Sequence, residues 1–341
     1  MTRFVKAIVL DWSSYWPGMG VAAMIAMAAT FLSMRYGAPA MLMALLMGLA
    51  VNFLGDSPKI LPGIEWAAST VLRLGVALLG LRITVNDVVS LGWLPIIAVC
   101  SAVLMTLGFG VVMARLLGLS TRLGLLTGGA VGICGASAAM AISSVFPGDG
   151  QQRKDTLFTV IGVTTLSTMA MVIYPLISHA FALSESATGL FLGATIHDVA
   201  QVVGAGYSVS AEVGDLSTFV KLLRVAMLVP VVIVIGLLVR RGLHKAQDNT
   251  VLAPPIPWFL VGFVVLFLVN SVNLLPAPLV DSAAASASWL LLIAIAALGV
   301  RTSLKELGSV GLRPMILMVA ETTFIALIML SFVLVYSSSI M

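Results

Sequence analysis

Long apolar runs follow one another along this chain, and they restrict its fold more than any other feature. Each run of about 17–25 residues is long enough to cross a hydrocarbon core of roughly 30 Å as a helix. Strands are excluded, because barrel strands are shorter and alternate polar with apolar residues. We expect spans near 17–34, 39–54, 66–85, 93–117, 122–146, 156–180, 187–209, 218–240, 257–275, 283–300 and 314–336.

The composition is that of an integral membrane protein. Hydrophobic residues make up 60% of the 341 residues and charged residues 9%, with a mean hydropathy of +1.13. These values exclude an ordinary soluble domain. The longest connections, 55–65 and 241–256, are too short to form one. We therefore expect an all-α membrane protein of about 11 (10–11) transmembrane helices, with residues 1–341 forming a single polytopic transporter domain.

The basic residues predict the orientation in the membrane. With the N-terminus inside, twelve lysines and arginines fall on the inner side, which supports a cytoplasmic N-terminus in the bacterial inner membrane. They are scattered and form no patch with interleaved aromatics, so no nucleic-acid partner is expected. The six on the outer side are Arg35, Arg82, Arg153, Lys154, Lys221 and Arg224.

Two stretches, 76–95 and 295–314, align without gaps and share a Leu-Gly-x-Arg core that includes Gly80/Gly299 and Arg82/Arg301. The second copy lies seven expected spans after the first and so runs the opposite way. Opposed copies are typical of secondary transporters with inverted repeats. The alternative is that two helix ends use the same pattern by chance.

A glycine-rich segment, 124–144, lies inside an expected span although glycine weakens helices. We interpret "GGAVGICGASA" as a helix break, because irregular backbone is tolerated at membrane depth where it lines a cavity. A new half-helix near Gly135 would point free N–H groups at an anion. The alternative is close helix packing through small residues. The candidate binding residues are Gly132, Cys134, Gly135, Ala136 and Ser137.

A second candidate segment, 193–208, carries polar residues in the middle of an apolar run. Asp198 and Gln201 have the spacing of a capping box, which predicts a helix N-terminus there. Together with His197 they are costly in lipid and should face protein or water. Histidine also titrates near neutral pH. The alternative is a structural polar knot that only caps a helix.

Other polar residues leave two interpretations open. Glu321 could carry a proton or pair with a neighbouring arginine. Arg82 and Arg301 could bind an anion or anchor helix ends at the interface.

Signatures of soluble enzymes are missing from the sequence. No Gly-x-Ser-x-Gly, His-Glu-x-x-His or P-loop occurs, so we expect no catalytic residues and no enzyme. Cys100 and Cys134 alone cannot form a zinc site, and no metal or cofactor is expected.

Four motifs resemble the YeiH family of uncharacterised bacterial multipass proteins, which are labelled sulfate exporters. They are LLGLR (78–82), CGASA (134–138), HDVAQVVGAG (197–206) and ALGVRTSLKEL (297–307). The resemblance implies a plasma-membrane exporter of sulfate or a related sulfonate. It also implies crossed, broken helices in a panel and a core domain, similar to sodium–bile-acid and sodium–proton carriers. The residues carried over are Cys134 to Ala138, His197, Asp198 and Gln201.

Three functions therefore remain for the chain. The first is a secondary transporter that exports a small anion, and the second is a proton- or sodium-coupled carrier of an organic acid. The third is a membrane-embedded enzyme or sensor. No ATP-binding motif is present, so transport would use a gradient. The expected partners are a small anion, the lipid bilayer, a coupling H⁺ or Na⁺, and a second copy of the chain in a homodimer.

Overall fold

The computed structural model describes residues 2–36, 40–85, 89, 92–146, 150–242, 258–272, 274–301 and 312–338. The structure is 88% helix, and the described residues contain no strand, which confirms the all-α class. The connection 243–257 and much of the second repeat copy, 302–311, lie outside the described residues.

The chain forms two compact units. Unit 1 comprises residues 1–90, 203–215 and 258–303, and unit 2 comprises the rest. The helical elements of unit 1 are α1 (Thr2–Tyr36), α2 (Ala40–Ala50), η1 (Asn52–Asp56), α3 (Leu61–Trp66), the π-helical turn η2 (Ala67–Val71), α4 (Leu72–Leu78), η3 (Leu79–Arg82), α14 (Trp258–Ser271) and α15 (Ala277–Arg301).

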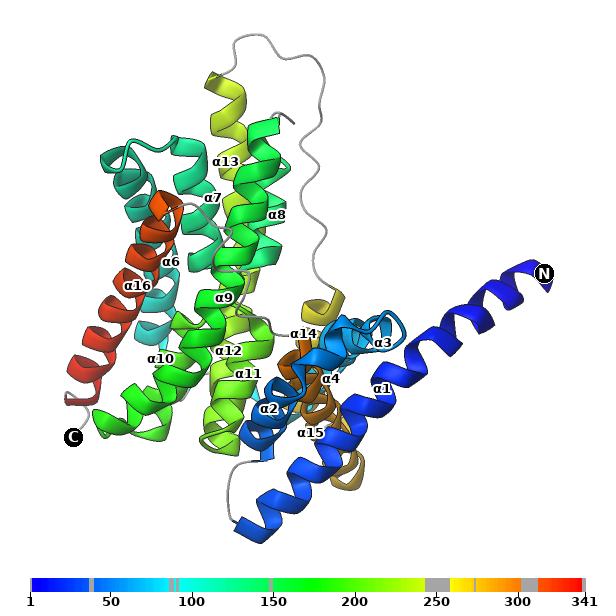
Figure 1. Cartoon of the computed structure of the whole chain (residues 1–341). Coiled ribbons are helices and arrows are strands. Elements are labelled where there is room, and N and C mark those ends of the chain that lie inside the picture. Colours follow the sequence, from blue (N-terminus) through cyan, green and yellow to red (C-terminus); the bar gives the residue numbers. More distant parts are fainter. Residues whose placement is uncertain are drawn as a thin grey trace. The chain divides into compact units, whose positions relative to one another are not determined.

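Unit 2 holds the remaining described helices. These are α6 (Trp93–Leu116), α7 (Thr121–Gly132), α8 (Ala136–Ser143), α9 (Gly150–Ala180), α10 (Glu185–Thr195), α11 (Val199–Tyr207), α12 (Ala211–Ala226), α13 (Leu228–Gly242) and α16 (Leu312–Ser338). The end of α11 and the start of α12 belong to unit 1. Within unit 2, α16 runs alongside α6 and also packs against α7, α9 and α10 (Figure 1).

Seven helices in the described part of the chain are long and apolar enough to cross a membrane. Each corresponds to an expected span, and α2 and α14 are shorter apolar helices at two further expected spans. The expected spans 122–146 and 187–209 are each divided into two short helices, α7/α8 and α10/α11. The number of crossings stays a prediction. The seven are Ser14–Tyr36, Leu61–Arg82, Trp93–Leu116, Lys154–Ala180, Ala211–Val239, Pro278–Arg301 and Leu312–Tyr336.

The paired glycines of the repeat make matching contacts in unit 1. Gly299 of α15 packs directly on the backbone of α2 at Leu45, and Gly80 of η3 packs directly on the backbone of α14 at Phe263. A Cβ atom at either position would collide with a carbonyl oxygen. Each glycine therefore lets two helices cross at the shortest distance, as small residues do in membranes. The inverted relation of the two copies stays a prediction.

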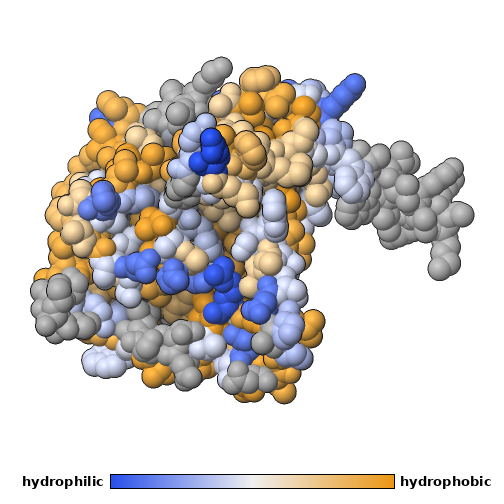
Figure 2. All heavy atoms as spheres, turned by 90° about the horizontal axis from the view of Figure 1, so that it is seen from below, coloured by the Kyte–Doolittle hydropathy of each residue, from blue (hydrophilic) through white to orange (hydrophobic). Residues whose placement is uncertain are grey.

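The outward faces of the long helices are apolar. On α6 and α16, large side chains such as Leu116 and Val335 are 77% and 67% exposed. In Figure 2, apolar residues form broad areas along the top and the sides of the view, and polar residues gather toward its middle. Exposed apolar surface on this scale is stable only against lipid. The chain is a multi-pass membrane protein.

Candidate functional site

The first glycine-rich segment is broken where the sequence predicts it. Helix α7 ends at Gly132 and α8 begins at Ala136, so Ile133 to Gly135 are not helical. Gly135 has φ +65° and ψ −129°, a conformation that essentially only glycine adopts. Its N–H donates back to the carbonyl of Ala130 at 2.8 Å. This glycine thus ends one half-helix and starts the next.

The second segment is broken as well, between Thr195 of α10 and Val199 of α11. The Ser167 hydroxyl of α9 accepts hydrogen bonds from the backbone N–H groups of His197 (3.1 Å) and Asp198 (3.0 Å). The Asp198 carboxylate accepts from the N–H of Ala200 at 2.8 Å and so caps α11. The N-terminus of α11 is therefore capped by side chains.

The predicted capping box is only half correct. Asp198 caps the helix, but Gln201 does not bond back to it. The Gln201 amide instead donates to the Thr168 hydroxyl of α9 at 2.8 Å, and Gln201 is almost completely buried. Gln201 bonds to Thr168 instead of to the start of its own helix, because α9 places a hydroxyl group beside it. The local sequence around Gln201 does not reveal this partner.

The two breaks lie against each other inside unit 2. A Cβ built on Gly135 would be 3.6 Å from the carbonyl oxygen of His197. The Lys221 ammonium of α12 donates to the carbonyl of Ile133 in the first break (2.6 Å) and to that of Ile196 in the second (2.9 Å). Segments 124–144 and 193–208 therefore contact each other, and each is non-helical over a few residues.

Arg224, one turn after Lys221, completes this bridge. Its Nη2 and Nε donate to the carbonyls of Val131 (2.7 Å) and Gly132 (2.8 Å), and its Nη1 donates to those of Gly193 (3.2 Å) and Ile196 (3.0 Å). The last carbonyls of a helix lack intrahelical partners and carry partial negative charge. Two cations therefore satisfy the C-terminal ends of both first half-helices.

The sequence analysis placed Lys221 and Arg224 on the outer side of the membrane, and this is wrong. Both side chains are completely buried. They were counted on the outer side because they lie within two turns of the start of the expected span at residue 218, whereas α12 begins at Ala211, two turns before that. A lysine and an arginine three residues apart, inside an apolar stretch that extends to Val239, were the signal available in the sequence.

Helix α16 contacts both broken segments through adjacent residues. The Thr127 hydroxyl of α7 donates to Oε1 of Glu321 at 2.8 Å. The Thr322 hydroxyl shares a hydrogen bond of 3.0 Å with Nε2 of His197. Both Glu321 and His197 have no exposed surface.

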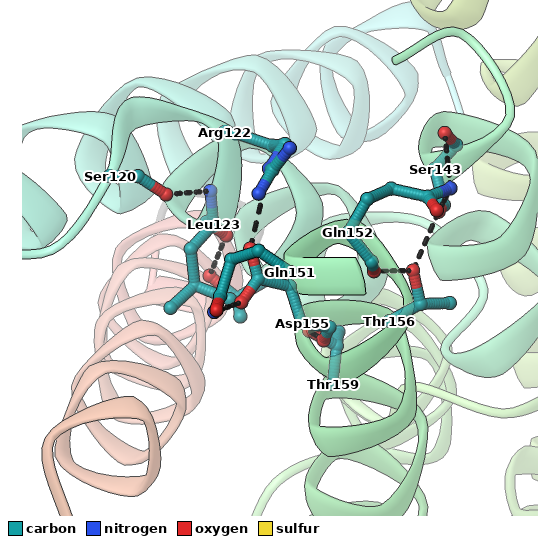
Figure 3. A network of polar contacts seen from close by, with 10 residues as sticks. Ser120, Arg122, Leu123, Ser143, Gln151, Gln152, Asp155, Thr156 and Thr159 are labelled. Atoms are coloured by element: carbon teal, nitrogen blue, oxygen red, sulfur yellow. Dashed lines mark hydrogen bonds and ion pairs between the residues drawn. The ribbon is translucent and has the colours of Figure 1, made fainter. Parts of the chain in front are cut away.

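The outer ends of the first broken segment are held by α9 (Figure 3). Arg122 of α7 forms an ion pair with Asp155 at 3.3 Å. Ser143, the last residue of α8, shares hydrogen bonds of 2.6 Å with Gln152 and with Thr156. Because α7 and α8 are both tied to one long helix, the break between them has a fixed geometry.

The remaining predicted site residues divide by position. Gly132, Cys134 and Gly135 are buried in the first break, Ala136 and Asp198 are partly exposed, and Ser137 is exposed. Gly135 offers no side-chain cap to α8. The N-cap residue of α8 thus offers no side-chain acceptor, whereas the N-terminus of α11 is capped by Asp198 and Ser167.

The two repeated arginines belong to unit 1. Arg82 forms an ion pair with Asp215 at 3.2 Å, and the Tyr207 hydroxyl donates a hydrogen bond to the same carboxylate. Arg82 and Asp215, with Asn270 and Asp281, line a cavity of about 560 Å³. Arg301, at the end of α15, is exposed. In this structure Arg82 is tied to a carboxylate within unit 1.

Comparison with known proteins identifies the family. The family model described as Conserved hypothetical protein 698 matches residues 17–318. The chain belongs to this family, UPF0324. The resemblance to YeiH-type proteins is confirmed. No solved structure matches the chain.

Three UPF0324 relatives match the chain over more than nine tenths of their own length. A UPF0324 membrane protein of Chlorobaculum tepidum is 48% identical over 96% of this chain and 91% of its own. One of Rhizobium meliloti is 50% identical over 94% and 92%. A third, from Paracoccus denitrificans, is 50% identical over 91% and 92% and is named TauZ.

Proposed function

We propose that this protein is a secondary transporter that exports a small anion, such as sulfate or a related sulfonate, across the bacterial inner membrane. The observation that carries the proposal is the pair of buried cations, Lys221 and Arg224, at the point where two broken helices meet. Breaks of this kind with facing helix ends are where secondary transporters bind their substrates.

The charge at the breaks favours an anion. Lys221 and Arg224 bind carbonyl oxygens, which orient their charges but do not neutralise them. Asp198 is the acidic residue of the two break motifs, and its carboxylate is engaged with the N-terminus of α11. The two basic groups thus outnumber this carboxylate at the breaks, which favours an anion over a cation.

The N-terminus of α8 supplies the place for the ligand. The first N–H groups of a helix have no intrahelical acceptor, and the N-cap residue Gly135 has no side chain that could accept from them. The exposed Ser137 hydroxyl lies in this first turn and adds a donor. Backbone donors with a positive dipole end are a common anion site.

The names of relatives support the substrate class. Two relatives, from Paracoccus denitrificans and Paracoccus pantotrophus, are named TauZ, and the name points to a role connected with taurine or other sulfonates.

The distribution of basic residues supports a cytoplasmic N-terminus. When the buried Lys221 and Arg224 are no longer counted on the outer side, four basic residues remain there against twelve on the inner side.

Counterflow in liposomes tests the proposal. Purified protein is reconstituted into vesicles loaded with unlabelled sulfate, and uptake of labelled sulfate is compared with that of protein-free vesicles. We expect uptake that competes with a short alkyl sulfonate. Competition by a carboxylate alone would indicate the organic-acid carrier instead. Absence of counterflow for sulfate, sulfonate and carboxylate would overturn the proposal and leave the enzyme or sensor.

A further inference from the structure

Glu321 is a buried carboxyl group within α16, and one of its two oxygens has no hydrogen-bond partner. Its side chain has no exposed surface, and Oε1 accepts from Thr127. Oε2 is buried and has no hydrogen-bond partner. A buried carboxylate in this state would be strongly disfavoured, whereas the protonated acid is neutral and keeps the Thr127 bond.

The sequence left open that an arginine neutralises Glu321, and no described arginine forms an ion pair with it. The ion pairs found among the described residues are Arg82–Asp215 and Arg122–Asp155. Helix α16 packs against α6, α7, α9 and α10. The titratable groups described on these helices and on α16 itself are Cys100, Arg115, Arg122, Lys154, Asp155, Tyr174, His179, Glu185, Arg313 and Tyr336. Arg115, Lys154, His179, Glu185 and Arg313 are exposed, and Arg122 and Asp155 pair with each other.

We propose that Glu321 is the proton-binding site that couples anion transport to H⁺, an inference that rests on the proposed transport function. Glu321 takes a proton from water on one side of the membrane and returns it to water on the other side. Its carboxyl group is neutral when buried, as in this structure, and ionises when the transport cycle opens it to water. No other bond is made or broken.

Two contacts connect Glu321 to the anion site. Thr127, which donates to Glu321, lies on α7 just over one turn before Gly132. The next residue of α16, Thr322, holds His197 of the second break at 3.0 Å. Loss of the proton at Glu321 would therefore strain helix packing at both broken segments at once, which is the requirement for coupling.

The same region argues against sodium as the coupling ion. Na⁺ in broken-helix carriers is held by unwound carbonyls and half-helix C-terminal ends. Here the C-terminal carbonyls of Ile133 and Ile196 are occupied by Lys221, and those of Val131, Gly132 and Gly193 by Arg224. Two fixed protein cations stand where a mobile cation would bind.

The test compares exchange with gradient-driven accumulation in the same liposomes. Membrane potential is clamped with K⁺ and valinomycin, sodium is omitted, and a pH difference of one unit is imposed in each direction. One such unit drives about a tenfold accumulation per coupled proton. Labelled sulfate reports the anion, and an internal pH dye reports the proton. Variants are Glu321→Gln, which keeps the shape and the Thr127 acceptor, and the exposed control Glu185→Gln.

We expect wild type and Glu185→Gln to accumulate sulfate in one gradient direction with matching proton movement. Glu321→Gln should retain sulfate exchange at equal pH but lose both the accumulation and the proton signal. Accumulation by Glu321→Gln equal to wild type, or its loss in His197→Gln instead, would overturn the assignment. A sodium requirement in wild type would overturn it too. No exchange in wild type refutes the transport function itself. If Glu321→Gln is eluted as aggregate, Glu321→Asp, which keeps the titrating group, must restore coupling together with folding.

Discussion

Replacing Arg224 with methionine is the most informative single change in the site. Methionine fills much of the arginine volume and suits a membrane helix, but it donates no hydrogen bond. Four bonds to carbonyl oxygens are lost. Ile196 keeps the bond from Lys221, so the carbonyls of Val131, Gly132 and Gly193 lose the donor that Arg224 supplied.

The expected loss of stability follows from these three carbonyls. A buried acceptor without a partner costs about 1–3 kcal/mol, which gives roughly 3–9 kcal/mol in all. Removing the buried guanidinium recovers part of this as desolvation free energy, so we expect a net loss near the lower end of that range, at about 3 kcal/mol. At about 2–4 °C for each kcal/mol, the melting temperature should fall by roughly 10 °C. Arg224→Lys has an ammonium group with three donors instead of the planar guanidinium. Its melting temperature should therefore lie between those of wild type and Arg224→Met.

Thermal melting in detergent, followed by circular dichroism and by size-exclusion chromatography after heating, measures this loss. The matched control is Arg115→Met in the same unit, because Arg115 is exposed and its bond to Thr121 is long, at 3.4 Å. An exposed change of this kind should stay within about 0.5 kcal/mol. If Arg224→Met melts with the control, the carbonyls have other partners and the bridging role of Arg224 is refuted.

Three further changes test the break itself. Ser137→Leu should abolish sulfate counterflow and leave the melting temperature unchanged, because the side chain is exposed and leucine suits a membrane helix. Normal flux in this variant would show that the N-terminus of α8 is not part of the site. A loss of stability together with the loss of flux would favour plain helix packing. Gly135→Ala should cost of order 1–3 kcal/mol in melting, because alanine is strained at φ +65°. Gly132→Ala should lower the stability less, since φ is ordinary there and the new Cβ would meet its nearest atom at 3.4 Å. Equal losses of stability in the two variants would show that the break requires glycine for space and not for its backbone conformation.

The sequence predicts the two breaks because their causes are local. Glycine at this density in 124–144 and the polar residues His197 and Asp198 in an apolar run conflict with a continuous helix, and the chain resolves each conflict by ending one helix and starting another. The exposed position of Ser137 and the cap from Asp198 follow from the same local patterns.

The residues that hold the breaks together could not be found this way. Lys221 and Arg224 act on carbonyls about 25 to 93 positions away in the chain, so their partners are set by tertiary packing. Ser167 and Thr168 of α9 are ordinary hydroxyls in an apolar helix, and only their position across from the second break gives them a role. The division of the chain into two compact units depends on the same long-range packing.

The order of donors and acceptors along the chain has a consequence for biogenesis. Helix α12 carries the basic groups of Lys221 and Arg224 into the bilayer, which makes it a poor substrate for insertion on its own. Every carbonyl that these groups bind lies earlier in the chain, between Val131 and Ile196. Because synthesis proceeds from the N-terminus, both breaks have left the ribosome before Lys221 emerges. The growing protein thus presents α12 with its acceptors, and a truncated chain that begins after Ile196 should fail to insert this helix.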